Sequence, residues 1–168
     1  MINDQAFFER NPGLDLRLVA EMNESLQAKF SDAEISRMSQ FLSATDIGSL
    51  RGSRPAIRDL PSSYVALLTK SNGGGIVIGN REIAFFDALT LRDYLVDYQF
   101  PVYMPGALPF GLNGGGVFYV FDMREAPVDG EFPILAAASG NLEYDSSPTI
   151  AHSLQQLLSD LTNIEDFL

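Results

Sequence analysis

Apolar residues recur at helical spacing in the N-terminal part of the chain. Side chains three or four positions apart predict an amphipathic helix over residues 15–29, with an apolar face formed by Val19, Met22, Leu26 and Phe30. A second helix is predicted over residues 32–43, because Ser31 and Glu34 have the spacing of a capping box, in which each side chain satisfies a backbone N–H. Both apolar faces are expected to contribute to a core.

Three more helices are predicted further along. The first covers residues 61–71, where Pro61 suits an opening turn and Asn72-Gly73 supplies a left-handed stop. The second covers residues 91–98 and ends before Pro101. The third covers about 148–162, because Ser147-Pro148 resembles a capped start to an apolar stripe formed by Ile150, Leu154, Leu157, Leu158 and Leu161.

Between these helices the apolar period changes to that of strands. Two short runs, 76–78 and 83–86, flank Gly79-Asn80 as in a hairpin. Residues 117–121 are apolar or aromatic throughout, which predicts a central strand covered on both faces. An antiparallel strand over 132–137 follows, and Pro133 indicates an outer or bulged strand start. The predicted fold is α+β, with a mostly antiparallel or mixed central sheet flanked by N-terminal, middle and C-terminal helices.

Residues 43–59 show no sustained period and are predicted to form a loop. This segment holds the basic cluster of the chain, Arg51, Arg54 and Arg58. A solvated loop that pairs with nearby acids is favoured over a phosphate site, because no glycine-rich turn or helix start accompanies the arginines.

Length and composition indicate one domain over residues 1–168. The 168 residues are 46% hydrophobic, enough for one core of ordinary size, and no Pro- and Gly-rich linker divides them. No apolar run is long enough to cross a bilayer, and the first residues, Met1-Ile2-Asn3-Asp4-Gln5, lack the pattern of a signal peptide. We therefore expect a cytoplasmic protein without a membrane partner. The absence of cysteine excludes disulfides, thiolate metal ligands and thiol nucleophiles.

The net charge of −11 is concentrated in one part of the chain, since residues 61–168 hold four basic and thirteen acidic side chains. Such a field repels phosphate backbones, so direct nucleic-acid binding is not expected. Two interpretations stay open: the acidity keeps the protein in solution, or it attracts a basic partner.

Little in the sequence favours catalysis. His152 is the one histidine, no G-x-S-x-G elbow accompanies it, and we expect it to be dispensable. The acidic residues lack the spacing of a calcium loop, so no metal or other cofactor is expected. The triple-glycine runs 73–75 and 114–116 are better explained as turns than as phosphate cradles, with Gly73 and Gly116 at positive φ. A pair of distant carboxylates acting as acid and base stays open as an enzymatic alternative.

Acidic residues gather around the turn after the central strand. Asp122, Glu125, Asp129 and Glu131 lie there, and Glu143 and Asp145 follow the next strand. These six side chains are the candidate partner-binding residues, with ordinary solvated turn charge as the alternative. Because the two strands are antiparallel and joined near Gly130, Glu143 could lie at the opposite end from the turn, so the two groups need not form one patch.

A set of motifs then suggests a family. They are Leu60-Pro61 and Tyr64 at a helix start, Asn72-Gly73-Gly74 at its end, Phe110-Gly111 and Gly114–Gly116 before the aromatic strand that ends in Asp122, and a leucine-rich closing helix. Over residues 31–162 the chain resembles the SUKH (SMI/KNR-like) superfamily, which leaves 1–30 as an N-terminal helical extension.

The resemblance implies a non-enzymatic binding module with a sheet flanked by helices. Many members are immunity proteins that occlude a cognate bacterial polymorphic toxin, often a nuclease with a basic cleft, which fits the acidic charge. The alternatives are a soluble enzyme that uses carboxylates or glycine turns, and a regulatory scaffold like the fungal members.

Overall fold

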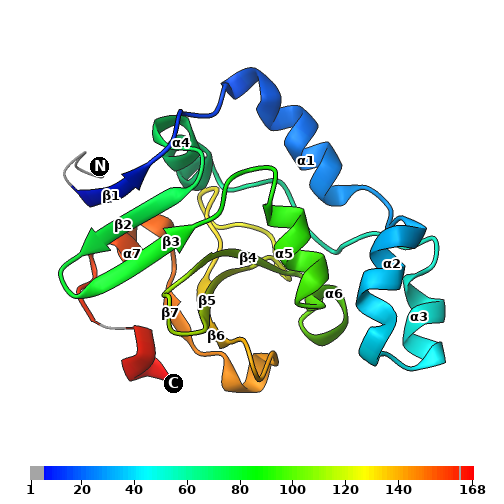
Figure 1. The fold of residues 1–168 in the computed structure, drawn as a ribbon. Coiled ribbons are helices and arrows are strands. Elements are labelled where there is room, and N and C mark those ends of the chain that lie inside the picture. The colour runs from blue at the N-terminus through cyan, green and yellow to red at the C-terminus, as the bar shows by residue number, and fades with distance from the viewer. Residues whose placement is uncertain (1–5, 163) are drawn as a thin grey trace.

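Seven antiparallel strands form one sheet in a computed structural model of the chain, which describes residues 6–162 and 164–168 (Figure 1). The strands are hydrogen-bonded in chain order: β1 (Phe7–Arg10), β2 (Gly74–Ile78), β3 (Arg81–Phe85), β4 (Ala107–Leu112), β5 (Val117–Asp122), β6 (Ile134–Ala138) and β7 (Thr149–Ala151). With the helices that surround this sheet the fold is α+β, as predicted.

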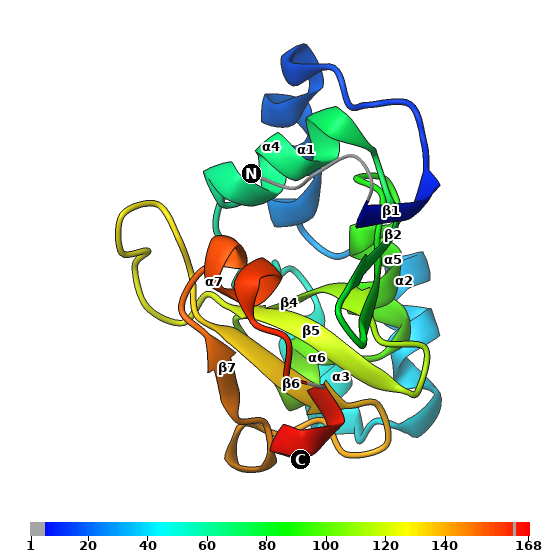
Figure 2. The same cartoon turned by 90° about the vertical axis from the view of Figure 1, so that its left-hand side faces the viewer.

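Helices cover the sheet from the N-terminal, middle and C-terminal parts of the chain. They are α1 (Val19–Gln27), α2 (Asp32–Met38), α3 (Ala44–Leu50), α4 (Ser62–Lys70), α5 (Leu91–Asp97), α6 (Phe100–Tyr103) and α7 (Leu154–Ser159). Short 3-10 turns are η2 (Leu16–Leu18), η3 (Ser39–Phe41), η4 (Tyr144–Ser146) and η5 (Ile164–Phe167). In Figure 1, α2 and α3 lie side by side at the edge of the molecule next to α5, whereas Figure 2 shows α4 and α7 together over β5 and β6.

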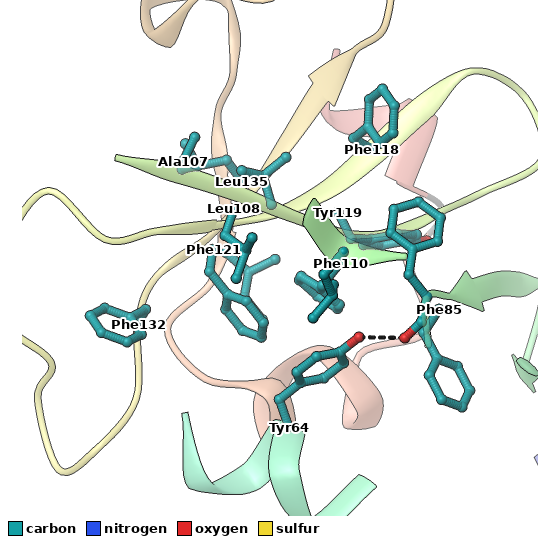
Figure 3. Close-up of a cluster of buried hydrophobic side chains, with 14 of the residues drawn as sticks. Tyr64, Phe85, Ala107, Leu108, Phe110, Phe118, Tyr119, Phe121, Phe132 and Leu135 are labelled. Carbon is teal, nitrogen blue, oxygen red and sulfur yellow. Dashed lines mark hydrogen bonds between the residues drawn. The ribbon is translucent and has the colours of Figure 1, made fainter. Parts of the chain in front are cut away.

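The predicted central strand is confirmed. β5 pairs with β4 on one side and β6 on the other, and residues 117–121 are all buried. Helix α4 packs on it through Tyr64, whose ring meets Phe110 and Phe121 edge-on at 5.4 and 5.5 Å (Figure 3). The fully buried Tyr64 hydroxyl donates a 2.8 Å hydrogen bond to the Phe86 carbonyl just after β3. One side chain thus connects α4 to β4, to β5 and to the residue that follows β3.

Most predicted elements form close to their expected bounds. Ser31 and Glu34 form the capping box, with N–H···O distances of 3.2 and 2.9 Å. The helices α4 and α5 and the β2–β3 hairpin also form as predicted. Gly73 and Gly116 have φ of +78° and +89°, which confirms that both occupy turns that disfavour a side chain.

The prediction of a loop over 43–59 is wrong in its first half, where α3 forms. Ser43 caps this helix by accepting a 3.1 Å hydrogen bond from the Asp46 N–H. Ile47 and Leu50 then pack in a small cluster with apolar side chains of α2 and α5. Tertiary packing therefore stabilises a short helix whose apolar pattern is too brief to be conspicuous in the sequence.

The predicted start of the terminal helix is also wrong. Ser147-Pro148 precedes β7, and the helix begins at Leu154 with Ser153 as its cap, whose hydroxyl accepts from the Gln156 N–H at 3.1 Å. The β-branched residues Thr149 and Ile150 belong to β7, which pairs with β6 through Thr149 and Ala151, instead of opening a helix. The helix ends at Ser159, and Leu161 is 62% exposed rather than part of its apolar face.

The expectation from Pro133 of an outer or bulged strand start is half correct, and two strands besides β7 were not predicted. β6 is not an outer strand, because it lies between β5 and β7, but its register against β7 shifts at its first residues. β1 is a short edge strand on β2. In β4, Pro109 and Gly111 lie on either side of a register shift against β5, and these two residues disguise the strand in the sequence.

Arg92 of α5 attaches the N-terminal helices to the rest of the fold. Its guanidinium donates to both Glu34 oxygens at 2.6 and 3.0 Å and to the Ser25 and Leu26 carbonyls at the C-terminal end of α1 at 2.8 and 2.9 Å. Nearby, Arg37 donates to Asp97 and to Asp93. The like-charged pair on α5 is thereby bridged by a cation from α2.

We predict that Tyr64→Phe lowers the free energy of unfolding by about 1–2 kcal/mol, because the Phe86 carbonyl loses a buried donor. Urea denaturation measures this change. Tyr103→Phe removes the hydroxyl of a side chain that is 47% exposed and should stay within about 0.5 kcal/mol of wild type. Equal effects of the two changes would contradict the assigned role of the Tyr64 hydroxyl.

Glu34 should make stability depend on pH. The Arg92 guanidinium that donates to Glu34 lowers the pKa of this carboxyl. Its contribution is therefore complete above the ordinary glutamate pKa of about 4.3 and is lost as pH falls through the lowered native pKa. Glu34→Gln should cost about 1–3 kcal/mol at pH 7, and urea denaturation across pH should show the gap from wild type closing in acid. Glu24→Gln, an exposed change on α1, should retain the wild-type profile.

Candidate partner-binding loop

The acidic loop, residues 122–131, joins β5 to β6 and projects away from the sheet (Figure 2, yellow). Its tip is a two-residue turn in which Asp129 and Gly130 have φ of +52° and +79°. The residues on either side, Val128 and Glu131, exchange two backbone hydrogen bonds of 3.0 Å. This is the Asp-Gly geometry of a tight hairpin, so the projecting loop has a defined conformation.

Arg58 holds the N-terminal side of the acidic loop. Its guanidinium donates to the Met123 carbonyl at 2.9 Å and to the Arg124 carbonyl at 3.3 Å. One of the three arginines of the predicted basic cluster is therefore committed to fixing this backbone.

Glu131 holds the C-terminal side. Its carboxylate accepts from the Ser63 hydroxyl at 2.7 Å, from the Ser63 N–H at 3.3 Å and from the Leu154 N–H at 3.4 Å. These two N–H groups lie in the first turns of α4 and α7, where backbone donors have no partner inside the helix and the helix dipole favours an anion. Glu131 thus caps two helices at once.

Asp122 forms an ion pair at the base of the loop. Arg124 donates to it at 2.7 and 2.9 Å, and this hydrogen bonding lowers the pKa of the Asp122 carboxyl. The Asp122 side chain is only 14% exposed. Its charge is therefore largely used inside the protein.

The same arginine brings in the segment of Glu143 and Asp145. The Arg124 guanidinium lies 3.6 Å from the centre of the Tyr144 ring, a cation–π contact. The Tyr144 hydroxyl donates to the Pro105 carbonyl at 2.8 Å, and burial raises its pKa to about 12. Although Glu143 follows the far end of β6, its neighbour Tyr144 thus returns to the base of the acidic loop.

The six predicted site residues consequently fall into two groups. Asp122 and Glu131 stabilise the structure through the contacts described above. Glu125, Asp129, Glu143 and Asp145 remain, and of these Glu143 accepts a 3.0 Å hydrogen bond from Asn141. Glu125 and Asp129 are exposed near the tip, on either side of Val128, which is 75% exposed. Exposed acidic and apolar side chains thus lie close together in sequence at residues 125–129.

The glycine turns and His152, the other residues considered for binding or catalysis, have the following surroundings. Asn113 accepts from the Gly115 and Val117 N–H groups at 2.8 and 3.0 Å, so these donors of the second glycine turn are already used. At Gly73, a Cβ would lie 2.9 Å from the Asp87 nitrogen, so close packing requires glycine. His152 is exposed between β7 and α7, and its backbone N–H donates to Gln156.

Residues 6–162 and 164–168 hold neither a metal-binding group nor a membrane-spanning helix. Within that part of the chain, no three His, Cys, Asp or Glu side chains are grouped so that they could hold a metal ion. None of the helices described there has the length and apolarity needed to cross a membrane.

Sequence reasoning missed the roles of Arg58 and Glu131. Arg58 lies 65 positions before Met123, and Glu131 lies 68 positions after Ser63. The Asp122–Arg124 pair, two positions apart, is the one contact here that the sequence signals directly.

Comparison with protein families matches residues 56–160 to a model described as the SMI1 / KNR4 family (SUKH-1). The match covers more than half of the chain, including the acidic loop and the elements from α4 to α7. It leaves α1, α2 and α3 outside. No match was found among curated proteins.

We predict that Glu131→Ala lowers the free energy of unfolding by about 1–3 kcal/mol, because it removes the cap of two helices. Glu125→Ala removes the same charge from the same loop at an exposed position and should change stability by less than about 0.5 kcal/mol. Urea denaturation of both variants tests the division of the acidic residues into two groups. Equal losses of stability would contradict it.

Proposed function

Because the chain belongs to the SMI1 / KNR4 family (SUKH-1), we propose that it is a non-enzymatic protein-binding module of the immunity type. In this proposal it works in the cytoplasm and neutralises a cognate bacterial polymorphic toxin by covering a basic surface of that toxin. The acidic loop is the element that docks.

The observation that carries the proposal is the way the acidic loop is built. Glu125 and Asp129 are exposed on a projecting turn whose two sides are held by Arg58 and Glu131. A loop already fixed in one conformation loses little conformational entropy on binding. Exposed Val128 adds an apolar contact between the two carboxylates.

Charge supports a basic partner. The protein carries a net charge of −11, and a field of this sign speeds encounter with a cationic surface. A nuclease toxin fits best, since its substrate cleft must attract phosphates, and carboxylates on a projecting loop can compete for the same cations. The immunity protein then binds the toxin and not the nucleic acid.

The test takes a toxin domain found encoded next to this gene and measures its association with the protein at low and high salt. In Glu125→Gln/Asp129→Asn, asparagine suits the positive φ at position 129 and the backbone contacts of the loop remain. We expect the association rate to fall several-fold at low salt and its salt dependence to flatten, with stability almost unchanged.

The matched control is Glu21→Gln/Glu24→Gln, which removes the same charge from exposed positions on α1. It should retain most of the wild-type association rate. If both double variants behave alike, the acidic loop is not the docking element. If the gene has no toxin gene beside it and the purified protein turns over a substrate, the immunity proposal itself is wrong.

A further inference from the structure

Helices α2 and α3, which lie outside the matched family region, enclose a groove of about 590 Å³. Phe30, Ile35 and Ile47 form the apolar part of its lining, and Asp32, Ser36 and Ser39 form a polar part. Arg51 and Gly52 complete it at the end of α3. In Figure 1 these two helices stand at the edge of the molecule, away from α4 and α7.

The bases around this groove differ from the others in the chain. Among residues 6–162 and 164–168, the side chains of Lys29, Arg51 and Arg54 form no hydrogen bond or ion pair, whereas Arg17, Arg37, Arg92 and Arg124 are all paired with carboxylates. All three are exposed. A 3.0 Å hydrogen bond from the Phe30 N–H to the Ser53 carbonyl joins their two chain segments.

Unneutralised bases are unexpected in a protein with eleven more acidic charges than basic ones. Where the described carboxylates form ion pairs, their partners are other arginines, so this set stays exposed beside the groove. Charge complementarity therefore favours an anionic partner group here, and the apolar part of the lining favours a hydrophobic side chain close to it.

We propose that the groove between α2 and α3 binds an acidic segment of a partner protein, in which an apolar side chain is followed by aspartate or glutamate. The apolar side chain rests on Phe30, Ile35 and Ile47, and a carboxylate accepts from the Arg51 guanidinium, whose planar donors suit a carboxylate. Asp32 also lines the groove and repels a carboxylate next to it, so the acidic residues of the segment lie on the Arg51 side.

This surface is separate from the acidic loop, and the inference does not depend on the identity of a toxin. The probe is the peptide acetyl-Gly-Leu-Phe-Asp-Glu-Gly-amide, added to the full-length ¹⁵N-labelled protein. We expect saturable changes in the NMR shifts of the Ser36, Ser39 and Gly52 amides, weakened by salt. The counterpart with Asn-Gln in place of Asp-Glu should bind at least about tenfold more weakly.

Substitutions of Arg51 and Arg54 test whether these side chains bind the peptide. Arg51→Gln/Arg54→Gln should weaken peptide binding at least about tenfold. Arg17→Glu changes the net charge by the same amount at a side chain that is 88% exposed on η2, and should bind as wild type does. Glu125→Gln/Asp129→Asn should also bind normally, which separates this surface from the proposed docking loop.

Several results would overturn the inference. They are the absence of saturable shifts up to about 1 mM peptide, shifts confined to other surfaces, and binding that persists in Arg51→Gln/Arg54→Gln. Inorganic phosphate is the remaining comparison. If phosphate alone reproduces the shifts and displaces the peptide, the site recognises a simple anion and not a protein segment.

Discussion

The packing of α4 against the sheet is the constraint on which the rest of the structure depends. Tyr64 places a large side chain on β4 and β5 and satisfies its hydroxyl at the end of β3. The preceding residue, Ser63, is the one that Glu131 holds. The core and the acidic loop are therefore attached to adjacent residues of the same helical turn, and the position of the loop follows from that of the core.

The fold class was predictable because its signals are local and agree with each other. The capping box at Ser31, the apolar stripe of α4 and the aromatic run of β5 each identify an element within a few residues. The predictions for two segments were wrong because their structure depends on contacts with distant residues. Ser43 and Ser147 both resemble caps, yet only Ser43 begins a helix. Ile47 and Leu50 find apolar partners after Ser43, whereas the residues after Ser147 form β7 and pair with β6. Distant contacts decided between equal local signals.

The sequence predicted which acidic residues lie near the loop, but it did not predict how they are arranged. The sequence shows that carboxylates gather after β5, and it cannot show which of them the protein uses itself. Glu131 acts on residues far away in the chain, and Tyr144 reaches Arg124 only because the segment after β6 turns back. The residues that remain available, Glu125, Asp129 and Asp145, become evident once the internal contacts are known.

In the acidic loop, the residues that the fold constrains are different from those that can be substituted freely. Asp129 and Gly130 adopt positive φ, which few residues tolerate, and Glu131 is tied to two helices. Positions 125–128 are exposed and have no such backbone requirement. Substitutions there can change the shape and charge offered to a partner at almost no cost in stability. Substitutions at these four adjacent positions could thus adapt the loop to a partner whose surface changes during evolution, while the contacts of Arg58 and Glu131 that hold the loop stay the same.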